Sequence, residues 1–319
     1  MISEKVILGI DTSNYTTSVA IVDIDGKIMA NLKRPLQVKE GERGLRQSDA
    51  LFLHTVNLPL LMQEVRKVLN ENIPVAIGVS QRPRNVEGSY MPCFLAGVSA
   101  AESISSVSGI PLYGFSHQCG HIMAAVLSSD KESILGKEFA AFHISGGTTE
   151  LVRVNAVASG FETELFGGTA DLNAGQVIDR IGVLMGLRFP AGPHLEELAL
   201  ENKKRIPKRQ VSSNGMKVNL SGLENMAAKL YRETEDKPLV SAFVLDFIGR
   251  SIIAMSEAYE KEFGKSTFVY AGGVMCNSII RKMLSERFDA VFADPSLSSD
   301  NAVGIAELTR RAFLKEGKN

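Results

Sequence analysis

The sequence predicts an α/β protein that folds into two lobes, and three observations lead to this class. The chain has 319 residues, which is at the upper edge of what one hydrophobic core supports, so two lobes of roughly 100 to 200 residues each are expected. Short β-branched, apolar runs alternate with longer segments in which apolar residues recur at helical spacing. A pattern of strand, small polar turn and second strand occurs twice, at residues 11–21 and 144–154.

The first half of the chain is expected to begin with three strands. Residues 6–10 and 17–23 are apolar and β-branched, and Asp25-Gly26 before residues 27–30 is a strong hairpin signal, so the chain opens as an antiparallel meander. Four elements then follow in order: a helix over 51–69, a buried strand over 74–79, a small-residue helix over 91–107 and a short strand over 110–113.

The second half repeats the alternation of strands and helices. The run before Gly136 marks a loop, and the elements expected after it are strands over 139–145 and 266–270, an amphipathic helix over 277–284 and an apolar helix that begins near residue 302. The chain between these segments carries further motifs, which we interpret from the chemistry of their side chains more than from the spacing of apolar residues.

Composition and cysteine content describe an ordinary soluble protein. Hydrophobic residues make up 45% and charged residues 22% of the chain, and we find no apolar run near the ~20 residues that a membrane span needs. Residues 6–10 are too short for a signal peptide and lead straight into Asp11, so we expect a cytoplasmic protein with no membrane partner. Cys93, Cys119 and Cys276 are widely spaced and odd in number, which predicts reduced thiols.

The charge of the chain restricts how it could bind nucleic acid. A net charge of -1 gives no global attraction to a polyanion, so such a partner needs a local patch. One candidate is K-K-R-I-P-K-R at residues 203–209, which has five basic side chains in seven and is broken by Pro207. The alternative is that this run is only a solvated surface loop.

Three glycine- or serine-rich turns are candidates for binding phosphate. D-T-S-N-Y-T-T-S-V-A-I at 11–21 and I-S-G-G-T-T-E-L-V-R-V at 144–154 each place a small polar turn between two strands, where backbone N–H groups and hydroxyls can face an anion. One such turn commonly just joins strands, but two in corresponding positions could hold the phosphates of a nucleotide from both sides. In the third turn, Gly272 and Gly273 follow a strand and precede a helix. These turns match neither the G-x-G-x-x-G fingerprint nor a P-loop.

Two histidines four residues apart are candidate metal ligands. If residues 115–126 are helical, His117 and His121 lie on one face about 6 Å apart and could bind one ion. The alternative is an ordinary pair on a helix. Gln118 occupies the position of a zincin general base and cannot take up a proton, which disfavours a metalloprotease. Asp300, before an apolar helix, could be a third ligand or only the N-cap of that helix.

Several motifs in the same order resemble the TsaD family, the tRNA threonylcarbamoyltransferase subunits. D-T-S in the first turn is similar to the first phosphate-facing turn of the family, H-Q-C-G-H to its H-x-E-G-H metal motif and S-G-G-T-T to its S-G-G-H-T. D-L-N-A-G-Q-V-I-D-R with F-P-A-G-P resembles D-D-A-A-G-E-A-F-D-K with Y-P-G-G, and the segments at 220–223, 271–277 and 299–302 match later signatures.

The resemblance covers nearly the whole chain and implies a fold, a domain division and a set of site residues. The fold is the two-lobed ASKHA (actin-like ATPase) fold, with duplicated ribonuclease H-like mixed sheets flanked by helices. The expected lobes are residues 1–115 and 116–319, and the last helix could return to the first lobe. The implied metal ligands, for iron or zinc, are His117, His121 and Asp300; the implied catalytic residues are Asp11 and Ser145; and the implied contacts to nucleotide or substrate are Ser145, Gly146, Gly147, Asp179, Gly192, Gly272, Gly273 and Asn277.

The resemblance also implies an activity and partners. The family transfers a threonylcarbamoyl group from threonylcarbamoyl-AMP to N6 of the adenosine beside the anticodon, in tRNAs that read codons beginning with A. The implied ligands are one divalent metal and ATP, AMP or threonylcarbamoyl-AMP, which Mg could accompany. The implied partners are tRNA, a second ASKHA-like subunit and a small ATPase, with the second subunit held by helices of the N-terminal lobe.

The sequence departs from the family pattern at several positions. Thr148 replaces the histidine of S-G-G-H-T, Gln118-Cys119 replaces the acidic interior of the metal motif, and the segment 171–180 is altered. Arg82 and Arg84 lie where the family has G-P-G-L, and they could bind a phosphate or form a charged loop. The alternative hypothesis is therefore a diverged metal- and ATP-binding paralogue: an ATPase or regulatory module, or a carbamoyltransferase with another acceptor.

Overall fold

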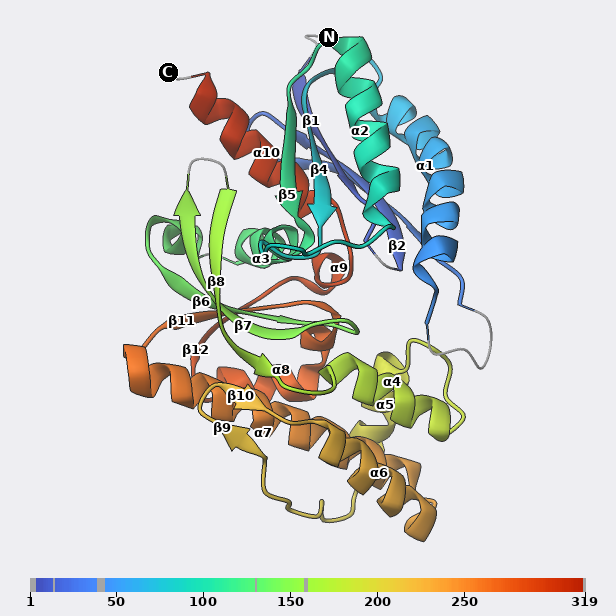
Figure 1. Ribbon diagram of the computed structural model, residues 1–319, viewed down its shortest axis with the longest axis vertical. Coiled ribbons are helices and arrows are strands. Elements are labelled where there is room, and N and C mark those ends of the chain that lie inside the picture. Colours follow the sequence, from blue (N-terminus) through green and yellow to red (C-terminus); the bar gives the residue numbers. More distant parts are fainter. Residues whose placement is uncertain (1–3, 14, 39–43, 130, 158–159, 318–319) are drawn as a thin grey trace.

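The computed structural model describes residues 4–13, 15–38, 44–129, 131–157 and 160–317, and within them two β-sheets that lie one above the other (Figure 1). Asn14, in the first polar turn, is outside the described residues. The first sheet has the strand order β3-β2-β1-β4-β5. Its strands are β1 (Lys5–Asp11), β2 (Thr16–Asp23), β3 (Ile28–Pro35), β4 (Ile73–Arg82) and β5 (Leu112–Ser116).

The predicted opening meander is confirmed. β1 pairs antiparallel with β2, which pairs antiparallel with β3, while β4 joins the other edge of β1 in parallel. Gly26 has a φ of +98°, a value that glycine adopts freely, in the turn that joins β2 to β3. β1 is buried on both faces from Val6 to Asp11, because helices cover both sides of this sheet.

Helices α1 (Gln47–Leu69) and α2 (Phe94–Ser108) cover one face of the first sheet, and α10 (Val303–Glu316) covers the other (Figure 1). Leu58, Leu61 and Val65 of α1 pack with Ile10 and Ile77 of the sheet in one apolar cluster. α10 comes from the far end of the sequence and contacts β1, β2 and β4. The C-terminal helix therefore belongs to the packing of the first sheet.

The second sheet has the order β12-β11-β6-β7-β8-β10-β9. Its strands are β6 (Phe139–Ile144), β7 (Thr149–Val157), β8 (Gly160–Thr169), β9 (Ser213–Asn214), β10 (Lys217–Val218), β11 (Thr267–Ala271) and β12 (Asp289–Phe292). Read from β8 to β12, five of them repeat the order, the antiparallel meander and the parallel strands of the first sheet. This repetition is the predicted duplication, and it places the ends of β1 and β6 in corresponding positions.

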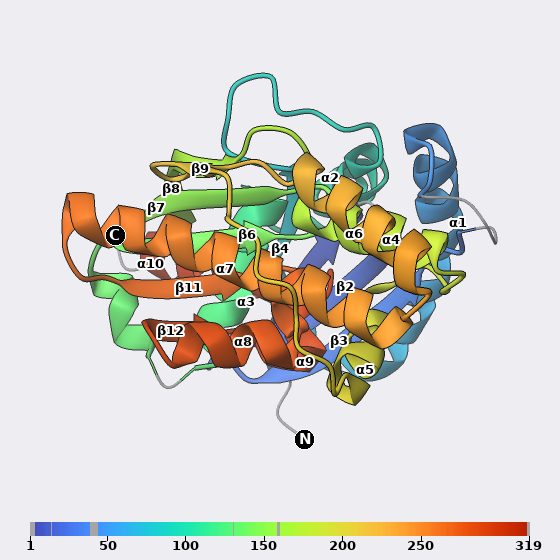
Figure 2. The same cartoon turned by 90° about the horizontal axis from the view of Figure 1, so that it is seen from below.

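The outer face of the second sheet carries most of the remaining helices, as the view from below shows (Figure 2). These are α4 (Ala174–Leu184), α5 (Gly192–Glu201), α6 (Ser221–Thr234), α7 (Lys237–Phe263) and α8 (Ser278–Ser285), while α9 (Pro295–Ser298) and the 3-10 turns η1 (Glu132–Gly136) and η2 (Gly273–Cys276) are short. α7 is long and apolar enough to cross a membrane, a property that we did not predict, but 83% of the apolar 18-residue stretch within it is buried inside the protein. It is the central helix of this core.

α3 (His117–Leu127) lies between the two sheets and contacts β4 and β5 of one and β6, β11 and β12 of the other. On its remaining side it packs closely against α10. A Cβ on Gly304 would lie 1.9 Å from the carbonyl oxygen of Gly120, so only glycine permits this approach. The close contact sets the position of the loop before α10 relative to the start of α3.

Candidate metal and nucleotide site

The two predicted histidine ligands lie in the first turns of α3. The Ser116 hydroxyl caps this helix by accepting a hydrogen bond from the amide of Cys119 at 3.2 Å. The helix begins at His117 and not at residue 115, and the spacing of four residues places the rings of His117 and His121 together, with centroids 4.4 Å apart. His117 is partly buried and His121 is 3% exposed.

Asp300 meets this pair from the loop between α9 and α10. Its Oδ1 lies 3.4 Å from Nε2 of His121 and 3.7 Å from Nε2 of His117. The alternative that Asp300 is an N-cap is wrong, because the side chain of Asn301 accepts the hydrogen bond from the Val303 amide at 3.0 Å. Asp300 and His117 are 183 positions apart in the sequence, and they lie together in the structure as the family resemblance implied.

Asp11, at the end of β1, holds His117 in one orientation. Its Oδ2 lies 2.8 Å from Nδ1 of His117, and its Oδ1 accepts from the Ser80 hydroxyl at 2.6 Å and from the Ser13 amide at 3.0 Å. Burial alone would raise the pKa of Asp11, but the charge and hydrogen bond of His117 outweigh it and lower that pKa. With Nδ1 engaged, Nε2 of His117 is free to face Asp300 and an ion, as in a carboxylate–histidine–metal arrangement.

A third histidine, which the sequence analysis missed, lies beside the first two. His143 on β6 is 2% exposed, and its ring centroid is 4.9 Å from that of His121 and 5.8 Å from that of His117. One nitrogen of each of the three rings falls within 4.8 Å of the other two. The signal available in the sequence was a histidine in the otherwise apolar strand F-A-A-F-H-I, directly before the S-G-G turn.

The chemistry of this cluster fits a divalent ion. Within the described residues, Nε2 of His121 and both ring nitrogens of His143 are buried with no hydrogen-bond partner. Burial, and then the charge of His117, lower the pKa of His121, which favours the neutral ring that a metal requires. Imidazole nitrogens and a carboxylate oxygen are ligands for zinc or iron.

The S-G-G-T-T turn lies against the first turn of α4. The carbonyl of Ser145 accepts from the Gly175 amide at 3.2 Å, and the hydroxyl of Thr149 accepts from the Ala174 amide at 2.8 Å. A Cβ on Gly146, Gly147 or Gly273 would meet nothing within 4 Å. These glycines therefore leave open space at the ends of β6 and β11, where a helix N-terminus and turn amides favour an anion.

Asp179 of α4 contacts the residue that precedes Gly192 at the start of α5. Oδ1 of Asp179 accepts from the amide of Ala191 at 2.8 Å, which fixes the segment that begins α5. Burial raises the pKa of Asp179 to about 6, although this hydrogen bond lowers it. Asn277 caps α8 by accepting from the Ile280 amide at 3.1 Å, and its predicted contact with a nucleotide stays a prediction.

The departures from the family motif form a network of their own. The Gln118 amide donates to Oε2 of Glu150 at 2.9 Å, and Arg84 pairs with the other oxygen of the same carboxylate. Arg84 is therefore paired inside the protein, and the proposal that it binds a phosphate loses support. Cys119 is buried, and Asn85 donates to its sulfur at 3.3 Å. Gln118 and Cys119 thus connect α3 to the loop after β4 and to β7.

Comparison with known proteins identifies the family. Residues 44–307 match the TsaD family, described as tRNA N6-adenosine threonylcarbamoyltransferase. The proteins of that name from Carboxydothermus hydrogenoformans and Thermosipho africanus are 30% and 29% identical, each over 97% of this chain and over 93% and 95% of their own.

Solved structures of low identity share the fold. HypF from T. kodakarensis matches with a TM-score of 0.66 at 13% identity, over 98% of this chain and 48% of its own. The activator of 2-hydroxyisocaproyl-CoA dehydratase from Clostridium difficile matches with a TM-score of 0.55 at 12% identity, over 98% of both chains. The fold is the predicted two-lobed ASKHA fold, and the chain belongs to the TsaD family.

Proposed function

We propose that this protein transfers a threonylcarbamoyl group from threonylcarbamoyl-AMP to N6 of the adenosine beside the anticodon, in tRNAs that read codons beginning with A. The observation that carries the proposal is membership of the TsaD family over residues 44–307, together with convergence of the ligand residues that the family motif implies. Because the acceptor is tRNA, the proposed location is the cytoplasm.

The adenylate would bind along the ends of β6 and β11. The open glycines 146, 147 and 273 let phosphate oxygens approach turn amides, and these fixed dipoles would stabilise the charge that develops as AMP leaves. The hydroxyl of Ser145 accepts from the Gly147 amide at 3.3 Å, so it shapes this turn as well as offering a donor. Asp179 and Asn277 would contact the adenosine or ribose part of the nucleotide.

A divalent ion, iron or zinc, would be held by His117, His121 and Asp300, and it would supply Lewis acidity that polarises the carbamoyl carbonyl. Asp11 would act here as a positioning residue, because it touches His117 and its other contacts are to serines. The exocyclic amine of adenine is a poor nucleophile, so its placement beside the acyl group must contribute much of the rate. Because the protein has a net charge of -1, it has no global attraction to tRNA, and local contacts must place the adenine.

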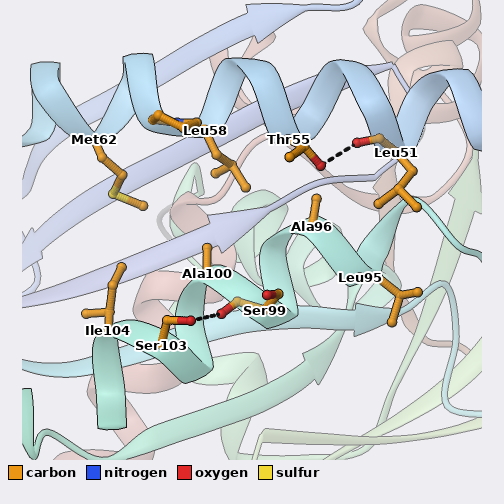
Figure 3. A pocket seen from close by; sticks show the side chains of 11 residues that line it. Leu51, Thr55, Leu58, Met62, Leu95, Ala96, Ser99, Ala100, Ser103 and Ile104 are labelled. Atoms are coloured by element: carbon orange, nitrogen blue, oxygen red, sulfur yellow. Dashed lines mark hydrogen bonds between the residues drawn. The ribbon is translucent and has the colours of Figure 1, made fainter. Parts of the chain in front are cut away.

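The face of the first lobe formed by α1 and α2 is the surface that we propose for the second ASKHA-like subunit. α1 and α2 line an apolar groove of about 560 Å³ (Figure 3). Two of the three hydroxyls that line it are satisfied within their own helices, since Thr55 donates to the Leu51 carbonyl and Ser103 to the Ser99 carbonyl. Phe52, Val56 and Leu95 of the same helices are 66%, 48% and 46% exposed, an apolar face suited to a pair of partner helices. The small ATPase remains a proposed third component.

The test is reconstitution with tRNA from a strain that lacks the normal transferase. The protein, an adenylate-forming enzyme and the partner subunits are supplied with threonine, bicarbonate and ATP, and the modified nucleoside is measured by mass spectrometry. We expect modification with the wild type and none with Asp300→Asn, whereas Leu95→Lys should lose activity only through loss of partner binding in a pull-down. Unmodified tRNA with the complete wild-type mixture would refute the proposal.

A further inference from the structure

His143 has a defined place in the second sheet. In β6 its strand neighbours are Glu150 of β7 and Ala271 of β11, so it lies at the centre of the sheet. Alternate residues of this strand face opposite sides. Phe142 and Ile144 belong to the apolar core on the α7 side, whereas Ala141 belongs to the core on the α3 side. His143 therefore faces α3, where His117 and His121 lie.

The surroundings of His143 give its ring no partner within the part of the chain that is described. Both ring nitrogens are buried and unpaired, and a buried polar group without a hydrogen bond costs about 1–3 kcal/mol. Two such atoms on one side chain are rarely retained in a core unless something binds them. The turn after β11 also packs closely on this part of β6, since a Cβ on Gly272 would lie 2.4 Å from the carbonyl oxygen of Ile144 and 3.1 Å from Cδ2 of His143.

The three rings are close enough to share one ion after small side-chain shifts. Two nitrogens bound to one zinc at about 2.1 Å each are at most about 4.2 Å apart. One nitrogen from each of the three rings lies within 4.8 Å of the others, so movements of about 0.6 Å or less bring them into range. An unpaired atom alone would not suffice. His54 is buried and its Nε2 is also unpaired, but its Nδ1 lies 2.8 Å from the hydroxyl of Thr17, and His54 is not among the described histidines whose ring nitrogens lie within 4.8 Å of one another.

We propose that His143 is a ligand of the same ion, so that the site has three imidazoles and the carboxylate of Asp300. Two histidines with one carboxylate leave several open positions and suit iron(II), whereas a third imidazole completes a four-ligand set of the kind that zinc accepts. This inference rests on the metal centre of the proposed function and is independent of the acceptor.

The first experiment needs no variant. The chain has five histidines, and the ring nitrogens of all five can be followed by long-range ¹⁵N–¹H NMR while zinc is added to metal-free protein. We expect three rings to show the shift of a metal-bound nitrogen, with those of His54 and His194 unchanged. Only two shifted rings would overturn the role of His143, and the absence of any shift would overturn the metal centre itself.

The second experiment compares His143→Gln with His54→Gln, which removes a buried histidine outside the cluster. Zinc affinity is measured by competition with a chelating dye, and cobalt(II) absorption reports the number of ligands. We expect His143→Gln to bind zinc at least about 100-fold more weakly, beyond the 10–100-fold typical of outer-shell partners, and His143→Asp to restore part of that affinity. Wild-type zinc affinity and an unchanged cobalt spectrum in His143→Gln would refute the inference.

Discussion

Gly304 lies where α10 crosses α3, and replacing it with alanine is expected to separate the two helices that position the proposed ligands. The new Cβ would lie 1.9 Å from the carbonyl oxygen of Gly120 and 3.1 Å from the amide nitrogen of Ala124. The nearest two obstacles are backbone atoms of Gly120, which cannot rotate away as a flexible side chain could. Since real Cβ atoms do not approach within 3.0 Å of such atoms, α10 must move by at least about 1 Å.

Two quantities should change together in Gly304→Ala. Overpacking of this kind costs about 1–3 kcal/mol of unfolding free energy. A site needs its ligands held within about 0.5 Å, and a shift of α10 carries Asp300 away from Nε2 of His121, which is now 3.4 Å from it. We therefore expect zinc affinity to fall by about 10- to 100-fold, the range seen when the support of a ligand is lost.

The assay pairs urea unfolding with a zinc competition titration on the same preparation. Gly222→Ala in α6 is the matched control, because a Cβ there meets nothing within 4 Å and its backbone is helical, so stability and zinc affinity should be kept. If Gly304→Ala binds zinc as the wild type does and unfolds at the same urea concentration, the contact between α3 and α10 does not set the ligand distances.

Three other substitutions test the same site from different sides. Burial raises the pKa of Asp179 to about 6, so the folded protein holds this proton more tightly than the unfolded chain and loses stability as pH rises from about 4 to 6. Asp179→Asn should remove that loss, gain at most about 3 kcal/mol at pH 8 in urea unfolding, and weaken AMP binding in calorimetry. Asp11→Asn should weaken zinc binding by about 10- to 100-fold in the dye competition, because His117 loses its carboxylate partner. Glu150→Gln should cost about 1–3 kcal/mol in urea unfolding, since the carboxylate is 10% exposed and binds both Gln118 and Arg84, whereas Glu164→Gln, at an exposed pair with Arg153, should cost less than about 0.5 kcal/mol.

Local patterns of the sequence were enough to predict most of the fold. The meander over residues 5–35 was predicted because alternating β-branched runs and Asp25-Gly26 specify strands and a turn within a few residues of each other. The pairing of His117 and His121 was predicted on the condition that residues 115–126 are helical, because a spacing of four brings side chains together on any helix. Membership of Asp300 in the cluster required the family resemblance, because no local pattern specifies a contact over 183 residues.

The misses have a common physical origin. His143 was overlooked because a single polar residue in an apolar strand has no periodicity, and its meaning appears only when α3 is packed on that face of the sheet. The contacts of Gln118 and Arg84 with Glu150 could not be predicted either. Glu150 lies on β7, after a different turn, and meets these two side chains only when the two sheets are packed together. The position of α10 depends on Gly9, Gly78 and Gly304, where neighbouring atoms approach too closely for a side chain. The sequence alone does not show which atoms these glycines will contact.

The duplicated sheets explain why the proposed metal and nucleotide sites adjoin. β1 and β6 occupy corresponding positions in their sheets, and each ends in a proposed metal-site residue followed by a polar turn: Asp11 before Thr12 and Ser13, and His143 before Ser145 and Gly146. On β6 only Ile144 separates the imidazole from the turn, so the distance from ion to phosphate would be set by the strand itself and not by side-chain packing. α3 lies between the two strand ends and supplies the ligands that join them. An ion bound there would therefore connect both lobes at the edge of the nucleotide turns. An acyl phosphate has to be polarised at this place, and relative movement of the lobes would otherwise disturb the alignment of the reacting groups.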